Sequence, residues 1–189
     1  MPRNDIIVSI TLGAETVRIG TLWFHMQGAR SSASFEYDKT WFMHPEKFAL
    51  DPALKLTEGT FHTPSDLSLF GAVGDSAPDR WGRVLMRRAA ASIAKNKKIT
   101  PPHLTEMDYL LGVTDEARQG ALRFSMAPFD TLFLASKDKA SIPPLITLPK
   151  LLSATERFIA HDENQADLKL LLAPGSSLGG ARPKSVCKR

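Results

Sequence analysis

Apolar side chains recur at every second position in the N-terminal part of the chain, which is the spacing of half-buried β-strands. The alternating positions are Ile6, Val8 and Ile10 in a first stretch and Val17, Ile19 and Thr21 in a second. We therefore predict strands over 5–12 and 16–26, joined by a tight turn at Gly13-Ala14-Glu15, and a third strand over 30–37. Short connections between consecutive strands predict an antiparallel meander.

The stretch 38–75 shows no such period and is interrupted by prolines and glycines. It nevertheless carries many large apolar side chains, namely Trp41, Phe42, Phe48, Leu50, Phe61, Leu67 and Phe70. So many apolar residues predict an ordered, packed connection instead of a flexible linker.

Helical spacing begins after Ser76. Ser76 and Asp79 are three residues apart, as in a capping box, and Pro78 is tolerated in a first helical turn. The apolar positions of this helix are Trp81, Val84, Leu85, Ala89 and Ile93. Lys95, Lys97 and Lys98 complement the C-terminal end of the helix dipole before Pro101-Pro102 ends the helix.

Further elements are predicted from shorter patterns. They are a helix over 105–111, a strand over 120–126 and two helices over 148–161 and 166–172. The proline-containing segment 128–149 is the best candidate for a domain boundary.

Composition indicates a folded core and the cellular compartment of the protein. With 43% hydrophobic residues among 189, the chain has enough apolar surface for a core. The single cysteine, Cys187, has no partner for an internal disulfide, which favours a reducing compartment. No apolar run approaches a membrane span, and residues 1–5 lack a signal peptide's apolar core, so we expect a cytoplasmic protein with no membrane partner.

The usual hydrolytic motifs are absent from the sequence. Its histidines show no metal-ligand spacing, and neither Cys-x-x-Cys, His-Glu-x-x-His nor Gly-x-Ser-x-Gly occurs. Metal-dependent hydrolysis and acyl transfer are therefore set aside, and no metal site is predicted.

The net charge of +4 is clustered. The basic residues gather at Arg80, Arg83, Arg87, Arg88, Lys95, Lys97 and Lys98, and again at Arg182, Lys184, Lys188 and Arg189. Such clusters contact nucleic acid or an acidic partner in some proteins and form a solvated helix face in others. The sequence leaves both interpretations open.

Small residues and cations near residue 180 have the chemistry of a phosphate cradle. The segment runs from Gly175 to Lys184, and its glycines allow close approach of backbone N–H groups to an anion. Gly175 and Gly180 have the spacing of the glycines of a P-loop, but Ala181 stands where the lysine should be. The kinase pattern Gly-x-Gly-x-x-Gly is also absent, so spacing alone favours a flexible tail.

Four segments resemble, in the same order, the HipA family of toxin kinases. They are Tyr37-Asp38-Lys39-Thr40-Trp41, the run 70–83, Gly120-Ala121-Leu122-Arg123-Phe124, and the run 177–184. The resemblance implies a small α/β N-terminal subdomain followed by a glycine-rich loop that opens an ATP-binding serine/threonine kinase core. It also implies a bacterial toxin–antitoxin system, a helix-turn-helix antitoxin similar to HipB as partner, and an aminoacyl-tRNA synthetase as substrate. DNA would be reached indirectly, through the antitoxin.

Residue by residue, the resemblance assigns roles only in the last segment. Ser177 matches the loop serine that is autophosphorylated, Gly179, Gly180 and Ala181 match the turn facing the ATP phosphates, and Lys184 matches the lysine that closes the loop. The motif Asp79-Arg80-Trp81-Gly82-Arg83 receives no catalytic role. There we expect Trp81 in the core, Asp79 as a helix cap and the arginines in local pairs.

The family's base and Mg²⁺ ligands lie downstream of the matched loop, and no catalytic residue is assigned here. We therefore expect the chain to come from a truncated or split gene, or to be a processed fragment, with no ATP or Mg²⁺ bound by this chain alone. The expected fold is α+β, with a small antiparallel, barrel-like sheet and packed helices. The expected domains are a HipA-like subdomain over 1–128, a linker over 129–147 and the beginning of a kinase-like N-lobe over 148–189.

Three functions follow from these expectations. The first is a non-catalytic interaction module that binds the antitoxin or the missing kinase core through an apolar and basic surface around the Trp81 helix. The second is one piece of a split kinase. The third is an accessory protein that contacts DNA.

Overall fold

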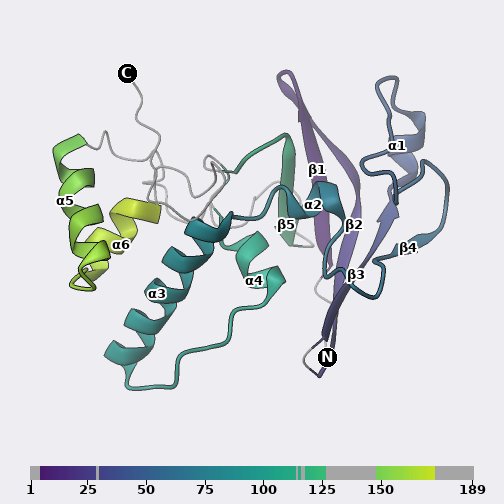
Figure 1. Cartoon of the computed structure of the whole chain (residues 1–189). Helices are drawn as coiled ribbons and strands as arrows, with labels where there is room; N and C mark the ends of the chain where they lie inside the picture. The colour runs from purple at the N-terminus through teal and green to yellow at the C-terminus, as the bar shows by residue number, and fades with distance from the viewer. Residues whose placement is uncertain (1–4, 29, 114, 116–117, 127–147, 173–189) are drawn as a thin grey trace. The chain divides into compact units, whose positions relative to one another are not determined.

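The computed structural model describes residues 5–28, 30–113, 115, 118–126 and 148–172. These residues divide into two compact units (Figure 1). Unit 1 contains 5–76 and 119–126, and unit 2 contains 77–118 and 148–172. The linker expected over 129–147 lies outside the described residues.

Unit 1 is built on a five-stranded antiparallel sheet with the order β4-β3-β2-β1-β5. Its strands are β1 (Ile6–Leu12), β2 (Glu15–Gln27), β3 (Arg30–Tyr37), β4 (Thr60–His62) and β5 (Leu122–Met126). The predicted antiparallel meander is confirmed in β1, β2 and β3, and β4 was not predicted. The sheet is open, so the chain has a mixed α+β fold but not the barrel-like closure that we expected.

The middle of the sheet forms part of the core of unit 1, and β1 is buried on both faces from Ile6 to Ile10. Ile6 pairs with Leu22 on β2 and with Met126 on β5, and Ile6 and Leu22 are fully buried. The β1–β2 register shifts after Val8, because Val8 pairs with Gly20 whereas Ser9 pairs with Arg18. This β-bulge leaves Ile19 as the extra residue of β2.

The stretch 38–75, which follows β3, is packed, as predicted. It contains α1 (Lys39–Met43) and α2 (Gly71–Gly74), and Trp41 and Phe70 are buried in it. The prediction was wrong for two other apolar side chains, because Phe48 and Leu67 are 43% and 47% exposed.

Tyr37, at the end of β3, fixes the connection to the sheet. Its hydroxyl donates to the carbonyl of Leu54 at 2.8 Å and accepts from the backbone N–H of Leu50 at 3.0 Å. Burial raises the pKa of Tyr37 above its ordinary value of 10.0.

Unit 2 is helical. Its helices are α3 (Arg80–Lys97), α4 (Glu106–Leu111), α5 (Leu148–Ile159) and α6 (Gln165–Leu172), all close to the predicted ranges. The residue that caps α3 is Asp79, whose carboxylate accepts from the backbone N–H of Gly82 at 2.9 Å. The predicted cap at Ser76 is therefore wrong, and the Ser76 hydroxyl lies 3.5 Å from the carbonyl of Ala72 instead.

The core of unit 2 lies where α3 meets the pair α5–α6. It consists of Trp81, Leu85, Leu151, Ala154, Phe158, Leu168 and Leu171. Ile93 was predicted on the apolar face of α3 but is 48% exposed. Each step of four residues turns an α-helix about 40° beyond a full turn, so Ile93 has rotated about 80° away from Leu85.

Within the residues that the structure describes, no helix is both long and apolar enough to cross a membrane.

Candidate binding pocket in unit 1

The residues expected to bind ATP and to be autophosphorylated lie outside the part of the chain that the structure describes. Ser177, Gly179, Gly180, Ala181 and Lys184 all lie beyond residue 172, where the described part of the chain ends. The other three segments that resemble the HipA family are described, and two of them meet.

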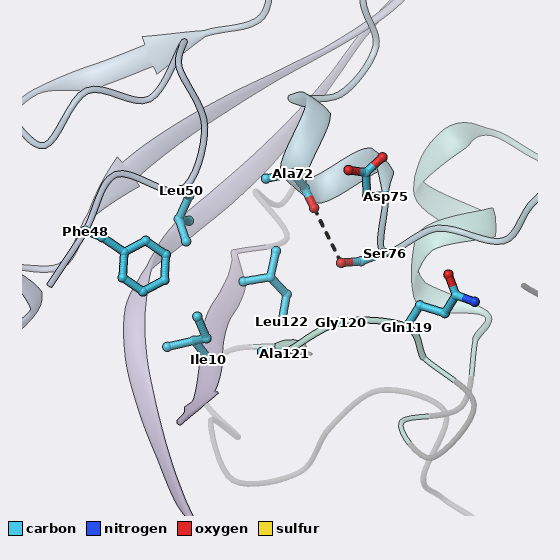
Figure 2. A pocket seen from close by; sticks show the side chains of 10 residues that line it. All are labelled: Ile10, Phe48, Leu50, Ala72, Asp75, Ser76, Gln119, Gly120, Ala121 and Leu122. Carbon is cyan, nitrogen blue, oxygen red and sulfur yellow. Dashed lines mark hydrogen bonds between the residues drawn. The ribbon is translucent and has the colours of Figure 1, made fainter. Parts of the chain in front are cut away.

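A pocket of about 360 Å³ opens in unit 1 (Figure 2). It is lined by Ile10, Phe48, Leu50, Ala72, Asp75, Ser76, Gln119, Gly120, Ala121 and Leu122. The run 72–76 belongs to one of the matching segments and the run 120–122 to another. Residues that are far apart in the sequence thus line the same pocket.

Backbone hydrogen bonds bring these segments together. Ile10 pairs with Leu122 across β1 and β5, and the N–H of Thr11 donates to the carbonyl of Ala121 at 2.9 Å. Gly120 has φ of +78°, a conformation that favours glycine and turns the chain into β5. On the other side, a carboxylate oxygen of Asp51 accepts from the N–H of Ala72 at 2.9 Å and positions α2.

The lining is mainly apolar. Ile10 and Leu122 are nearly buried, at 5% and 7% exposure, whereas Phe48 keeps 43% of its surface exposed. Figure 2 shows the Phe48 ring beside Leu50 and Ile10. Asp75 is exposed and is the one charged side chain among these ten residues. A pocket of this kind fits an apolar side chain whose neighbour or terminus is cationic.

The segment Tyr37 to Trp41 is explained by local structure. Asp38 caps α1 by accepting from the N–H of Thr40 at 3.0 Å and forms an ion pair with Arg18 at 3.0 Å. Burial raises the pKa of Asp38, but the hydrogen bonds from Thr40 and the charge of Arg18 outweigh burial. The net effect is a pKa below the ordinary value of 3.8.

The motif Asp79-Arg80-Trp81-Gly82-Arg83 has the structural roles expected for three of its residues. Asp79 is the cap of α3, Trp81 is 3% exposed, and Arg83 forms two hydrogen bonds with Glu106. The hydrogen bonds from Arg83 to Glu106 raise the pKa of Arg83 above its ordinary value. Arg80 differs, because it is exposed and has no ion-pair partner within the described ranges.

The apolar part of the surface that we expected to bind a partner around Trp81 is buried. The Trp81 ring packs edge to face against Phe158, with centroids 4.8 Å apart, and α5 and α6 complete that core. The apolar part of that surface is therefore buried inside unit 2, whereas its basic residues Arg80, Arg87 and Lys95 are exposed, and binding of a partner there stays a prediction.

Gln119 lines the pocket but was not named from the sequence. Phe48 was expected only as a packing residue and Asp75 only as part of the run 70–83, because the pocket forms only when these segments meet in the fold. In the described part of the chain, no group of three or more His, Cys, Asp or Glu side chains could hold a metal ion.

Comparison with models of known protein families, with curated proteins and with solved structures finds no match for this chain.

Proposed function

We propose that this chain is the N-terminal portion of a HipA-like toxin kinase and acts as a non-catalytic interaction module of a toxin–antitoxin system. The observation that supports this proposal is the pocket of unit 1. Two segments that resemble the family, 72–76 and 120–122, line that pocket together. Segments that share a family resemblance and also meet in space are best explained by one common site.

The proposal also includes the roles that the resemblance implies in an intact kinase. Residues 148–189 would begin a kinase-like N-lobe, with Ser177, Gly179, Gly180, Ala181 and Lys184 facing ATP and Mg²⁺ once a kinase core is present. The substrate would be an aminoacyl-tRNA synthetase in the cytoplasm.

The partner follows from the chemistry of the pocket. An apolar lining with a single carboxylate at Asp75 favours a protein that presents an apolar side chain next to a cation. A helix-turn-helix antitoxin, which carries basic residues for DNA, or the kinase core itself meets this requirement. DNA would then be contacted through the antitoxin.

Affinity capture tests the partner. A tagged polypeptide of residues 1–189 is used to capture proteins from the native cells, and each captured protein is identified, purified and titrated calorimetrically. We expect a helix-turn-helix protein or a kinase core. Recovery of neither would refute the proposed function.

Two matched variants test the pocket. Phe48→Ser should weaken binding about tenfold or more, because a partly exposed aromatic at an interface centre contributes at least 1.4 kcal/mol. Leu67→Ser is the control, since Leu67 is similarly exposed in the same connection but does not line the pocket. Equal affinities of the two variants would show that the partner binds elsewhere.

A second candidate function is one piece of a split, ATP-dependent kinase. It is favoured by the match of 177–184 to the family's loop, and labelling of Ser177 in the presence of an added core tests it.

A further inference from the structure

The structure divides the basic cluster of α3 into two groups. Arg83 and Arg88 point into unit 2. Arg83 pairs with Glu106, and Arg88 donates to Glu163 at 3.0 Å and to the carbonyl of Phe158 at 2.8 Å. The guanidinium of Arg88 also lies 3.8 Å from the centroid of the Phe158 ring. These two arginines hold the helices together and are not available to a partner.

The second group faces outward. Arg80, Arg87, Lys95 and Lys98, which we call the basic stripe, are all exposed. At about 100° per residue, the first three fall within roughly 80° of one another around α3, and Lys98 caps the same helix. At about 1.5 Å per residue the stripe is about 27 Å long. The stripe thus places four cations on one side of a single helix.

Acidic side chains do not neutralise the stripe. The sequence of α3 contains no Asp or Glu. Four acidic residues of unit 2 are engaged internally: Asp79, next to Arg80 in the chain, accepts from the N–H of Gly82, Glu106 pairs with Arg83, Glu163 pairs with Arg88, and Asp108 belongs to the capping box of α4. Within the described residues, Arg80, Lys95 and Lys98 have no ion-pair partner, and Arg87 makes a single 3.4 Å contact with the Tyr109 hydroxyl. The positive potential along the stripe is therefore open to a partner.

We propose that the basic stripe of α3 binds the phosphate backbone of double-stranded nucleic acid without reading its sequence. This inference goes beyond the proposed function, which requires DNA contact only through the antitoxin. Several cations on one side of a helix can meet successive phosphates, and the small side chain of the exposed Ala91 lets the middle of the helix approach closely.

The surroundings of the stripe disfavour two other kinds of anionic partner, an acidic protein surface and single-stranded nucleic acid. Protein interfaces have an apolar centre, but the stripe encloses only Ala91 and the half-buried Val84. Single strands are bound by stacking bases on aromatic rings. The aromatic side chains described in unit 2, Trp81, Tyr109 and Phe158, are all at least 94% buried. A duplex backbone needs neither feature.

The salt dependence of binding gives the stripe a measurable signature. If its four cations each meet one phosphate, log K should fall with log salt at a slope of about −3.6. Between 50 and 200 mM salt, the stripe should then lose roughly a hundredfold in affinity. The basic residues after position 180 add a separate contribution, so variants are needed to isolate the stripe.

Fluorescence anisotropy with the polypeptide 1–189 provides the test. The probes are two unrelated DNA duplexes, a duplex RNA, a single-stranded DNA and a polyglutamate peptide. The stripe variant is Lys95→Gln with Lys98→Gln. The control is Lys55→Gln with Lys169→Gln, which removes the same charge from exposed positions elsewhere. Circular dichroism confirms that both variants fold.

We expect equal binding of the two DNA duplexes and a salt slope that is smaller in magnitude by about 1.8 in the stripe variant. The control should keep most of the original slope. A preference above tenfold for DNA or RNA duplex would identify which of the two supplies the phosphates. Equal slopes in the two variants, tighter binding of single strands, or binding of polyglutamate but not of duplex would each overturn the proposal.

Discussion

Replacing Trp81 with alanine should destabilise unit 2 severely. Trp81 is 3% exposed and lies in the middle of the core shared by α3, α5 and α6. Its ring packs edge to face on Phe158, at 4.8 Å and 75°. Removal of a large buried aromatic costs about 3–5 kcal/mol, of which the ring pair accounts for roughly 0.5–1.5. Since a whole domain is stable by only about 5–15 kcal/mol, unit 2 should lose much of its stability.

Phenylalanine at the same position should be tolerated. Within the described residues, the Trp81 Nε1–H is buried without a hydrogen-bond acceptor. Leaving such a group unsatisfied costs about 1–3 kcal/mol, so its removal offsets part of the lost volume. We expect Trp81→Phe to remain within about 1 kcal/mol of the original protein.

Hydrogen exchange followed by mass spectrometry is the appropriate assay, because it reports α3, α5 and α6 separately from the sheet of unit 1. Urea titration with far-UV circular dichroism gives the free energy of unfolding. If Trp81→Ala kept normal protection of α3 and α5, the ring would not be a core residue. If that variant also lost its partner, Trp81 would belong to an interface.

Three further predictions concern packing, acid stability and the loop. Gly20→Ala should cost about 1–3 kcal/mol and lower the urea midpoint, because an added Cβ would lie 2.3 Å from the carbonyl oxygen of Glu36 and 2.5 Å from the Phe35 ring; an unchanged midpoint would contradict this packing. Hydrogen bonds from Arg157 hold the pKa of Asp167 below its ordinary value of 3.8, so its contribution to stability is complete above about pH 4 and is lost as the pH falls further. The stability difference between the original protein and Asp167→Asn should shrink below about pH 4, and a difference independent of pH would exclude this linkage. The polypeptide 1–189 should not transfer phosphate from labelled ATP, whereas with a kinase core added the label should appear on Ser177 and disappear in Ser177→Ala; label that persists in that variant would break the residue match.

Some regular elements could be predicted because apolar residues recur in the sequence with a short period. Alternation of apolar residues predicted β1 and β2, and helical spacing predicted α3. The three-residue strand β4 (Thr60–His62) is too short to show a period and is defined by its pairing with β3. Residues 60–62 therefore carried no signal in the sequence.

Of the two caps that we expected for α3, Ser76 and Asp79, only Asp79 is correct, for a local reason that the sequence does contain. The residue before a proline is disfavoured in the helical conformation, so Ala77 cannot open a helix that runs through Pro78. Asp79 is the first residue after that restriction with a capping side chain, and it caps the helix. The pocket of unit 1 could not be predicted in this way, because Phe48, Asp75 and Gly120 are far apart in the sequence and come together only in the folded unit.

The run 70–83 illustrates how a family-like segment combines structural and exposed positions. It passes from unit 1 to unit 2 between Ser76 and Ala77. Packing in the core accounts for four of its apolar residues, which are buried: Phe70, Val73, Ala77 and Trp81. The charged side chains of the run that stay exposed are Asp75, which lines the pocket, and Arg80, which begins the basic stripe.

Binding and stability should therefore separate along this segment. Asp75→Lys should weaken binding of the protein partner, and Arg80→Gln should weaken binding of the duplex. Each should change the free energy of unfolding by no more than about 0.5 kcal/mol, because substitutions at exposed positions rarely cost more. Trp81→Ala, in contrast, should directly lower the free energy of unfolding of unit 2. If Asp75→Lys and Arg80→Gln destabilised the protein as much as Trp81→Ala, the whole segment would serve packing alone. The resemblance to a toxin kinase would then reflect the requirements of the fold and not of a binding site.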